Sequence, residues 1–483
     1  MTTFVGRSRE LAALDGFLDE ARAGQGVLIS MRGRRQVGKS RLVGELVARS
    51  GVPAVFFAAS RQPSGTERAI FAEAVNASGT PSAATRAGAQ GGSWEAELLL
   101  ATADAAPGRP VIVVIDELPY LVESEPAFEA ILQKVWHTLE KRAVLLILIG
   151  SDISMMEQVT AYKRPLYGRA REMIVHPLSV VEVARMRGLG PTAALEAYLV
   201  IGGFPRLAGL WRPKDTVATF IRRELADESS PLVVAGERSL AAEFPADLNA
   251  RAVLSAIGAG ERSYGAIVDR SGVGRGTVDR ALGVLIEKRV VRRANPYAEP
   301  ASAKLPRYAV ADPYLRFWLR FVQPGIELIA RGRGDLAASR VVEGWSEYRG
   351  RAIEPLIRES IERMLPHPSL GEASFVGSYW TKDNRTEVDL VGGRGPAQAG
   401  QVDFIGSIKW RERAPFDRHD LLALGDARTR VPGTGPGTRL VGVSRSGFAT
   451  EGLDLALDPA MLVAAWNDED AAANHAVPLR RRR

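Results

Sequence analysis

Residues Gly33 to Ser40 have the types and the spacing needed to hold phosphate groups. They read Gly-Arg-Arg-Gln-Val-Gly-Lys-Ser and match the pattern G-x-x-x-x-G-K-[ST]. The glycines allow a tight turn whose backbone N–H groups point at phosphate oxygens. In such a loop, Lys39 reaches the terminal phosphates and the Ser40 hydroxyl is a ligand for Mg²⁺. The segment therefore predicts a site for a nucleoside triphosphate and Mg²⁺, formed by Gly33, Arg34, Arg35, Gln36, Val37, Gly38, Lys39, Ser40 and Arg41.

The elements on either side of this loop are those that the pattern requires. An apolar run over Val27–Met31 predicts a buried strand, and the residues from Lys39 to Ser50 predict a helix that Gly51 ends. The N-terminus of that helix adds a partial positive charge beside the bound anion. A glycine-rich turn that matches by chance is the alternative, and the strand and helix argue against it.

A second apolar run, Val111 to Ile115, ends in two acids, Asp116 and Glu117. The run predicts a strand buried on both faces, and ligands of open parallel sheets lie at the carboxyl edge. There Asp116 is placed to hold Mg²⁺, and Glu117 to orient the attacking water. The alternative is a buried strand that runs into an exposed acidic turn.

Two further residues are candidates at the same edge. The apolar run Val144–Ile149 predicts another buried strand, and Ser151 follows it, where it could contact the terminal phosphate; a plain strand end is the alternative. Arg169, in the segment Pro165-Leu166-Tyr167-Gly168-Arg169, could contact phosphate, or it could simply be solvated.

These motifs, in this order and together with Phe4-Val5-Gly6-Arg7, resemble the archaeal-type ATPase family, a branch of the P-loop ATPases related to AAA+ and signalling NTPases. Gly202-Gly203-Phe204-Pro205-Arg206 is similar to the Gly-Gly-x-Pro element of that family's helical lid. The resemblance implies a P-loop NTPase core with a parallel sheet over residues 1–178 and a helical lid over residues 179–244. It also implies that ATP is the nucleotide, and the absence of an Asn/Thr-Lys-x-Asp guanine element favours ATP as well.

Residues 249–310 have a different character. A helix is predicted over residues 250–257, and two short helices within residues 263–272 and 273–288 across a glycine-containing turn. Basic strands over residues 289–293 and 304–310 flank a proline-rich loop. The unit, assigned to residues 245–322, resembles a winged helix-turn-helix. Eleven of its residues between positions 251 and 310 are Lys or Arg and five are Asp or Glu, which favours a nucleic-acid partner. The residues expected to contact duplex DNA are Arg275, Thr277, Arg280, Arg292 and Arg293. A winged helix that docks onto protein is the alternative.

The last predicted domain, residues 323–470, has the order helix, strand, strand, strand. An amphipathic helix is predicted over Val341–Met364, with strands over residues 374–380, 386–391 and 402–410. This order, with Asp389 and Lys409, resembles the PD-(D/E)xK restriction-endonuclease-like α/β domain. That site needs an acid two residues before the lysine, and Ser407 occupies this position, so the domain is expected to be degenerate even if Glu354 supplies a second carboxylate.

Composition sets further limits. The chain has no cysteine, its five histidines lack metal-ligand spacing, and its formal net charge is +7. There is no signal-peptide pattern and no apolar run long enough to span a bilayer, so a cytoplasmic protein without a membrane partner is expected. Residues 471–483 are expected to form a basic disordered tail.

Taken together, the sequence predicts a Mg²⁺-dependent ATPase that acts as a switch in a DNA-associated process. Two alternatives stay open, namely an ATP-dependent nuclease and a signalling NTPase scaffold that binds protein partners. A homo-oligomer is compatible with each of the three.

Overall fold

The computed structural model describes residues 4–82, 85, 92–244, 247–297, 305–395 and 401–467. The chain divides into two compact units, Met1–Leu178 and Ser179–Arg483. The predicted tail over residues 471–483 and the first residue of the second predicted wing strand, Lys304, lie outside the described residues. The subdivision of the second unit into lid, winged helix and C-terminal domain stays a prediction.

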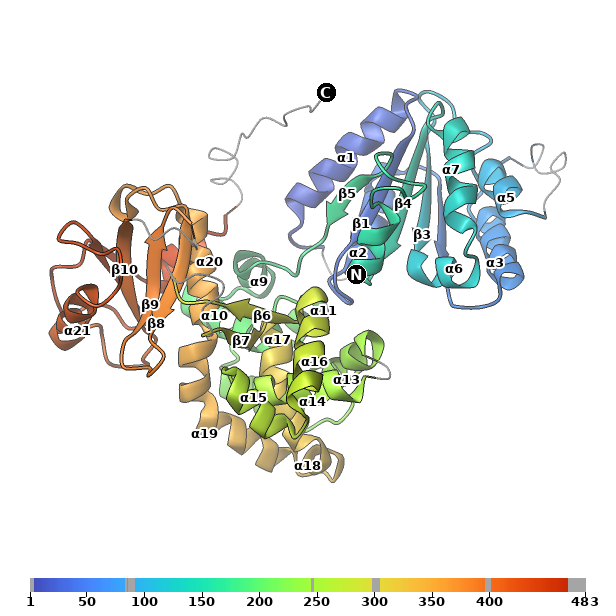
Figure 1. Ribbon diagram of the computed structural model, residues 1–483. Coiled ribbons are helices and arrows are strands. Elements are labelled where there is room, and N and C mark those ends of the chain that lie inside the picture. Colours follow the sequence, from blue (N-terminus) through green and yellow to red (C-terminus); the bar gives the residue numbers. More distant parts are fainter. Residues whose placement is uncertain are drawn as a thin grey trace. The chain divides into compact units, whose positions relative to one another are not determined.

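The first unit is built on a five-stranded parallel sheet in the order β2-β3-β4-β1-β5. All residues of β1 and β4 are buried, as expected for apolar strands covered on both faces. Because the strands are parallel, their carboxyl ends lie at one edge, and the loop after β1 and the acids after β3 meet there (Figure 1). The strands are β1 (Val27–Arg32), β2 (Ala54–Ala58), β3 (Val111–Asp116), β4 (Val144–Gly150) and β5 (Arg171–Ile174).

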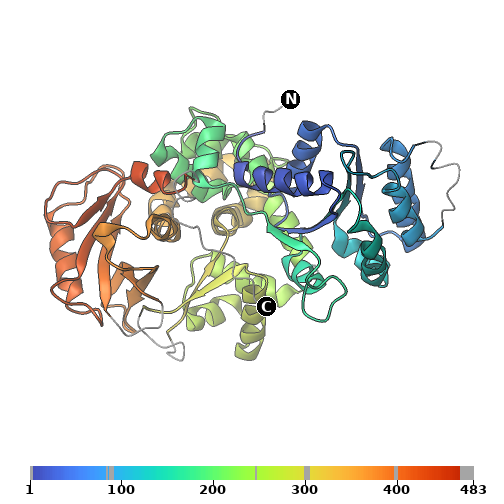
Figure 2. The ribbon, with the colours of Figure 1, turned by 90° about the horizontal axis from the view of Figure 1, so that it is seen from above.

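Helices cover both faces of this sheet (Figures 1 and 2). α1 and α2 pack together on one face, and α3, α5 and α7 pack on the other. The second face has an aromatic core, in which the Trp94 ring lies 5.6 Å from the Phe71 ring and 5.2 Å from the Phe128 ring. The helices of this unit are α1 (Ser8–Arg22), α2 (Lys39–Ser50), α3 (Ser64–Ala77), α5 (Trp94–Ala101), α6 (Leu118–Ser124), α7 (Phe128–Leu139) and α8 (Ile153–Val159).

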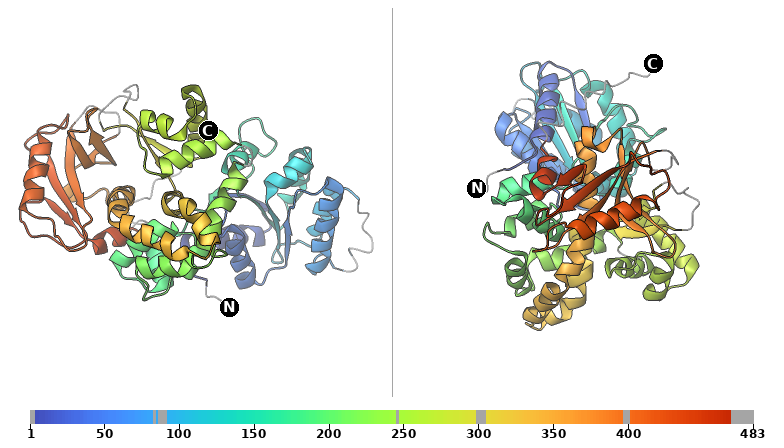
Figure 3. Two further views of the ribbon diagram at one scale, coloured as in Figure 1. Left: turned by 90° about the horizontal axis from the view of Figure 1, so that it is seen from below. Right: turned by 90° about the vertical axis from the view of Figure 1, so that its left-hand side faces the viewer.

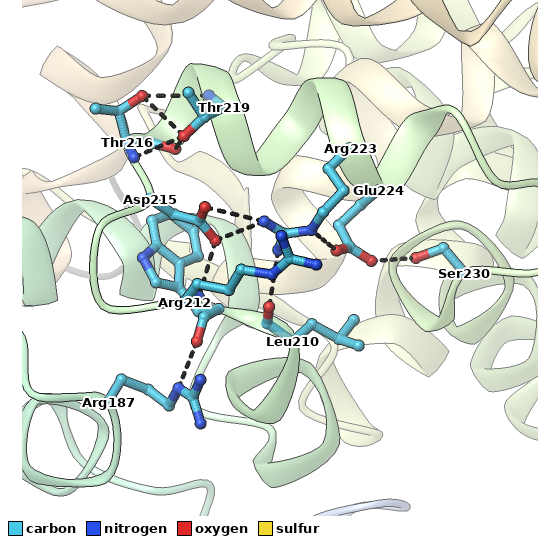
Figure 4. Close-up of polar contacts among 10 residues, drawn as sticks. Arg187, Leu210, Arg212, Asp215, Thr216, Thr219, Arg223, Glu224 and Ser230 are labelled. Atoms are coloured by element: carbon cyan, nitrogen blue, oxygen red, sulfur yellow. Dashed lines mark hydrogen bonds and ion pairs between the residues drawn. The ribbon is translucent and has the colours of Figure 1, made fainter.

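The second unit opens with five helices, and polar contacts of Arg223 hold the turn between two of them. Arg223 donates to both carboxylate oxygens of Asp215 at 2.8 and 2.9 Å, to Glu224 at 2.9 Å and to the Leu210 carbonyl at 2.8 Å (Figure 4). Beside this network, the Trp211 ring stacks on Phe220 with their centroids 4.3 Å apart. The turn between α11 and α12 is therefore held from both sides. The helices are α9 (Val180–Arg187), α10 (Pro191–Ile201), α11 (Pro205–Leu210), α12 (Val217–Leu225) and α13 (Pro231–Glu243).

Three short helices and a two-stranded antiparallel ribbon follow in the order expected from the sequence. The helices are α14 (Leu248–Gly258), α15 (Tyr264–Ser271) and α16 (Arg275–Glu287), and the strands are β6 (Val291–Ala294) and β7 (Arg307–Val310). α15 begins at the Ser263 cap, whose side chain accepts the Ala266 N–H, and α16 buries Val278, Ala281, Leu282 and Leu285.

The aromatic segment after this ribbon is helical and buried. It comprises α17 (Pro313–Phe317) and a π-helical turn (Trp318–Val322). The Trp318 indole donates to the Val233 carbonyl at 2.7 Å, and the Tyr314 hydroxyl donates to the Leu232 carbonyl at 3.0 Å. The segment is thus fastened to α13 through both its rings and its polar atoms.

The chain ends in a mixed sheet of order β12-β11-β10-β9-β8, with α20 and α21 packed against it (Figures 1 and 3). The strands are β8 (Phe375–Trp380), β9 (Glu387–Gly393), β10 (Val402–Lys409), β11 (Arg439–Ser444) and β12 (Leu455–Leu457). The helices are α18 (Ile326–Ala330), α19 (Gly334–Ala352), α20 (Glu354–Met364), α21 (Arg418–Arg428) and α22 (Pro459–Ala464).

One prediction about this region was wrong. The single helix expected over Val341–Met364 is two helices, α19 and α20, which are separated at Ile353. Pro355 explains the break, because proline lacks an N–H and its ring clashes with the preceding turn of a helix. Glu354 consequently lies in the first turn of a new helix. Among the helices of the described residues, none combines the length and the apolar character needed to cross a bilayer.

Candidate functional site

The loop Gly33–Ser40 connects β1 to α2 and has little room for larger residues. A Cβ atom on Gly33 would lie 2.2 Å from the Val175 carbonyl oxygen. Gly38 has a φ of 94° and Gln36 a φ of 64°, so the backbone turns twice through the left-handed region within three residues. Such turns align successive N–H groups toward one point, which is how a loop of this kind binds phosphate.

Lys39 is the charged group at the centre of this loop. Its side chain is only 7% exposed, and its Nζ donates to the carbonyls of Gly33 at 2.7 Å and Arg34 at 3.0 Å. Burial lowers the pKa of Lys39 to about 8, although the carboxylates of Glu117 and Asp116 act in the opposite direction. The ammonium group is therefore held in a partly desolvated position where an anionic ligand would stabilise its charge.

Ser40 and Asp116 are brought together across the sheet edge. The Ser40 hydroxyl donates to Oδ2 of Asp116, and Oδ1 of Asp116 accepts the Glu117 N–H at 2.9 Å. A hydroxyl and a carboxylate oxygen are hard ligands, and Mg²⁺ typically takes one or two protein oxygens with the remainder from phosphate and water. The donor set at this position fits Mg²⁺.

Glu117 has an unusual backbone conformation that directs its side chain. Its φ of 53° and ψ of 47° are left-handed, a conformation that costs a non-glycine residue about 1–3 kcal/mol. The carboxylate accepts the Ser151 hydroxyl at 2.9 and 3.0 Å, so the ends of β3 and β4 are joined at this residue. Ser151, expected beside the terminal phosphate, thus contacts the residue expected to orient water.

The other predicted residues of this region lie in different settings. Arg34 and Arg35 are partly exposed in the loop, and Arg41 is exposed in the first turn of α2. Arg169 donates to the carbonyls of Pro165 at 3.1 Å and Tyr167 at 3.5 Å, so its guanidinium is held by its own loop. Whether Arg169 contacts phosphate stays a prediction.

One residue beside the loop was part of the family resemblance but was not assigned to the site from the sequence. Arg7 is 5% exposed, and it donates to the Val37 carbonyl at 2.9 Å and to Glu10 at 3.0 Å. It therefore supports the outer side of the phosphate loop from the start of α1. The signal available in the sequence was Gly6-Arg7 immediately before an amphipathic helix, which by itself does not reveal a contact 30 residues away.

The predicted DNA-contacting residues do not all share one face. Arg275 and Arg280 are exposed on α16, and Thr277 lies beside Arg280 at 3.4 Å. Arg292 and Arg293 are successive residues of β6, so their side chains point to opposite faces of the ribbon.

The ribbon register gives the cross-strand neighbour of each arginine. Arg293 is opposite Tyr308 and Arg292 is opposite Ala309, so each arginine shares a face of the ribbon with that partner.

The end of this ribbon is bound inside the second unit. Tyr297, 2% exposed, belongs to the apolar core of the C-terminal sheet, and its N–H donates to the Ser378 carbonyl at 2.8 Å. A Cβ atom on Gly393 would lie 2.0 Å from the Tyr297 hydroxyl oxygen, so only glycine fits there. The ring of Trp380 lies 4.5 Å from the Arg307 guanidinium, which completes the contact.

The four residues of the predicted nuclease-like site are near one another. Asp389 accepts the Ile408 N–H at 2.8 Å and the Ser407 hydroxyl at 3.3 Å. Burial raises the pKa of Asp389, whereas Lys409 acts to lower it. Burial also raises the pKa of Glu354, and the charge of Asp389 adds to this rise.

The basic groups of this region already have partners. Arg358 lies 3.5 Å from Glu354 and donates to the Asp389 carbonyl at 2.9 Å, and Lys409 is paired at 3.4 Å with Asp420, outside the cluster. With Ser407 in place of an acid, a cation at this position would lack one fixed negative ligand.

We therefore predict that the purified wild-type protein does not cleave DNA. A neutral hydroxyl is a weak Mg²⁺ ligand, so bound water would stay mostly protonated and unreactive. Incubation of supercoiled plasmid and of single-stranded DNA with Mg²⁺ checks this, with Asp389→Ala and Lys409→Ala as comparisons. Mg²⁺-dependent cutting by the wild type that both substitutions remove would show that the site is active.

Comparison with known proteins gives a family of described activity for the N-terminal part of the chain and a family of unknown function for part of the remainder. Residues 4–206 match a family described as an ATPase domain predominantly from Archaea, and residues 318–420 match a family of archaeal and bacterial proteins of unknown function. An uncharacterised protein of Methanocaldococcus jannaschii is 26% identical over 290 residues, which is 58% of this chain and 64% of that relative. The match thus covers less than two thirds of the relative's length.

Solved structures with a similar arrangement include three archaeal proteins. The Walker-type ATPase of Pyrococcus abyssi is 19% identical, with a TM-score of 0.43 over 66% of this chain and 96% of that chain. The ORC2 protein of Aeropyrum pernix, in ADPNP–ADP complexes, is 15% identical, with a TM-score of 0.41 over 68% and 95%. The ORC1 protein of the same organism, in complex with DNA, is 18% identical, with a TM-score of 0.36 over 68% and 95%.

The loop Gly33–Ser40, at the edge of a parallel five-stranded sheet, thus lies within the part of the chain that is similar to an ATPase domain predominantly from Archaea.

Proposed function

We propose that the protein binds ATP with Mg²⁺ at the loop Gly33–Ser40, hydrolyses it, and uses the cycle as a switch in a DNA-associated process. The main support for this proposal is a pair of side-chain hydrogen bonds near the buried Lys39. Ser40 meets Asp116, and Ser151 meets Glu117, all at the carboxyl edge of one sheet. Two oxygen ligands, a buried cation and a separately oriented carboxylate are the groups that phosphoryl transfer to water needs.

Each side chain then has a defined task. The loop amides and Lys39 hold the phosphates and compensate their charge. Ser40 and Asp116 hold Mg²⁺, which when bound neutralises charge on the phosphate oxygens. Glu117 orients a water molecule for in-line attack. The Ser151 hydroxyl lies within hydrogen-bond distance of both Glu117 carboxylate oxygens and so holds the carboxylate in position.

The DNA part of the proposal rests on the exposed face of α16. Arg275 and Arg280 are exposed and lie near the start of this helix, where side chains of a helix-turn-helix reach the major groove. Since Tyr297 is bound in the C-terminal core, we take α16 as the main contact.

Replacing Arg275 and Arg280 together by alanine is expected to weaken duplex binding. If each arginine neutralises one phosphate, the slope of log K against log salt falls by about two. Fluorescence anisotropy with a labelled duplex over a range of salt concentrations measures this. A matched pair, Arg331→Ala with Arg385→Ala, removes two exposed arginines elsewhere in the same unit and should leave the slope unchanged. Equal slopes for the α16 variant and the wild type would place the DNA contact elsewhere.

A protein-docking role is the second candidate, because one specific observation favours it. The ribbon that would insert into DNA as a wing is occupied by a contact with the C-terminal sheet, through Tyr297 and Arg307. A winged helix used in this way is a packing module, and α16 would then be a surface for a protein partner. Absence of duplex binding by the wild type at low salt would favour this role over the DNA role.

A further inference from the structure

Tyr120 joins three segments at the edge of the first sheet. It lies on α6, three residues after Glu117, and it is partly buried. The guanidinium of Arg35, from the phosphate loop, donates through Nη2 to the Tyr120 hydroxyl. The guanidinium carbon of Arg61, from the segment after β2, lies 4.1 Å from the Tyr120 ring centroid, and Arg61 is also paired with Glu123 at 3.0 Å.

The same residue is part of the turn that sets the conformation of Glu117. The Tyr120 N–H donates to the Glu117 carbonyl at 2.9 Å, which closes the first turn of α6. A left-handed glutamate persists only where its surroundings determine it. On the N-terminal side, Asp116 restrains the Glu117 backbone by accepting its N–H. On the C-terminal side, α6 restrains it, and the contacts of Tyr120 hold the first turn of that helix.

We propose that Tyr120 is a positioning residue for hydrolysis, since its hydroxyl connects the phosphate loop, through Arg35, to the turn that directs the Glu117 carboxylate. The inference rests on the proposed ATPase function and adds a residue to it. A triphosphate bound by the loop fixes the backbone at Arg35. The hydrogen bond from the Arg35 side chain to Tyr120 then restrains the position of α6. The connection acts on the orientation of Glu117, which hydrolysis needs and nucleotide binding does not.

The proposed role needs the hydroxyl group of Tyr120 as well as its ring. A phenylalanine ring would keep the contact with Arg61, because the attraction of a guanidinium to a ring face needs no hydroxyl. It could not accept a hydrogen bond from Arg35. Tyr120→Phe therefore removes the hydrogen bond to Arg35 and keeps the ring contacts, including that with the Arg35 guanidinium, whose carbon lies 5.8 Å from the ring centroid.

The experiment compares kcat for ATP with the Kd for a non-hydrolysable ATP analogue in Tyr120→Phe and the wild type. We expect kcat to fall about tenfold, which is the size of effect when a hydrogen bond to a charged donor is lost. The Kd should stay within about twofold, since the phosphate contacts are unchanged. Tyr162→Phe is the matched control, because Tyr162 is 73% exposed in the same unit, and both variants should be folded at the assay temperature.

A double substitution tests the connection itself. Arg35→Gln should lower kcat as well, and adding Tyr120→Phe to it should lower kcat no further, since both changes break the same bond. A wild-type kcat in Tyr120→Phe, in an assay where Glu117→Gln is slow, would overturn this inference and leave the proposed function standing. A rise in Kd with kcat unchanged would overturn it too. A wild type that does not hydrolyse ATP would contradict the proposed function and this inference together.

Discussion

Lys39→Ala should bind ATP about 30 to 5,000 times more weakly than the wild type. Truncating one partner of a desolvated charge pair costs about 2–5 kcal/mol, because the remaining charge loses its fixed counter-charge. Lys39 is 7% exposed and is the buried cation in the loop that would meet the phosphates. Isothermal titration with ATP and Mg²⁺ measures the loss. Lys134→Ala removes a lysine that is 70% exposed in the same unit and should bind ATP as the wild type does.

The lowered pKa of Lys39 adds a pH dependence to this result. Because burial brings the pKa to about 8, the free protein loses the ammonium charge as the pH rises through that value. Binding of ATP then requires uptake of one proton, so the affinity should be constant below about pH 7.5 and fall about tenfold per pH unit above about pH 8.5. In Lys39→Ala this dependence should disappear. A wild-type affinity that is flat from pH 7 to pH 10 would show that the pKa of Lys39 in the free protein is not lowered to about 8.

Glu117→Gln should bind ATP normally and hydrolyse it at least about a hundredfold more slowly, which is the usual contribution of a positioned general base. Glutamine keeps the size of the side chain and one oxygen that can accept the Ser151 hydroxyl, so the fold of the site is preserved. Phosphate release in single-turnover conditions separates hydrolysis from binding.

The control for this substitution is Glu140→Gln, a change of the same chemistry at a glutamate that is 43% exposed at the end of α7. It should leave the hydrolysis rate unaltered. If Glu117→Gln turned over ATP as fast as the wild type, then Glu117 would not be the residue that orients water, and the Ser151 contact would be structural.

The parts of the fold that could be predicted from sequence are those with local signals. Val27–Arg32 is mostly apolar and Val144–Gly150 is an uninterrupted apolar run, as expected for strands covered on both faces, and α2 follows the loop and ends before Gly51. The same signals located Lys39 and Asp116, because the carboxyl ends of parallel strands meet at one edge.

What could not be predicted depends on contacts between distant segments. Trp94 lies in a stretch of small and polar residues, and its role in the core appears only when Phe71 and Phe128 surround it. Tyr297 lies in the loop after β6, as expected, but its packing into the core of the C-terminal sheet has no signal in the sequence. Tyr120 has no motif at all, because its importance comes from Arg35 and Arg61, which lie 85 and 59 positions away in the sequence. No periodicity records such pairings.

The proposed function joins ATP hydrolysis at the loop Gly33–Ser40 to DNA. It is tested by the steady-state rate of ATP hydrolysis by the wild type and by Lys39→Ala, with Mg²⁺, in the presence and absence of duplex DNA. We expect hydrolysis by the wild type that requires Mg²⁺ and changes in rate with duplex, and no hydrolysis by Lys39→Ala under either condition. Equal rates for the two proteins, or a wild-type rate that duplex does not change, would contradict it.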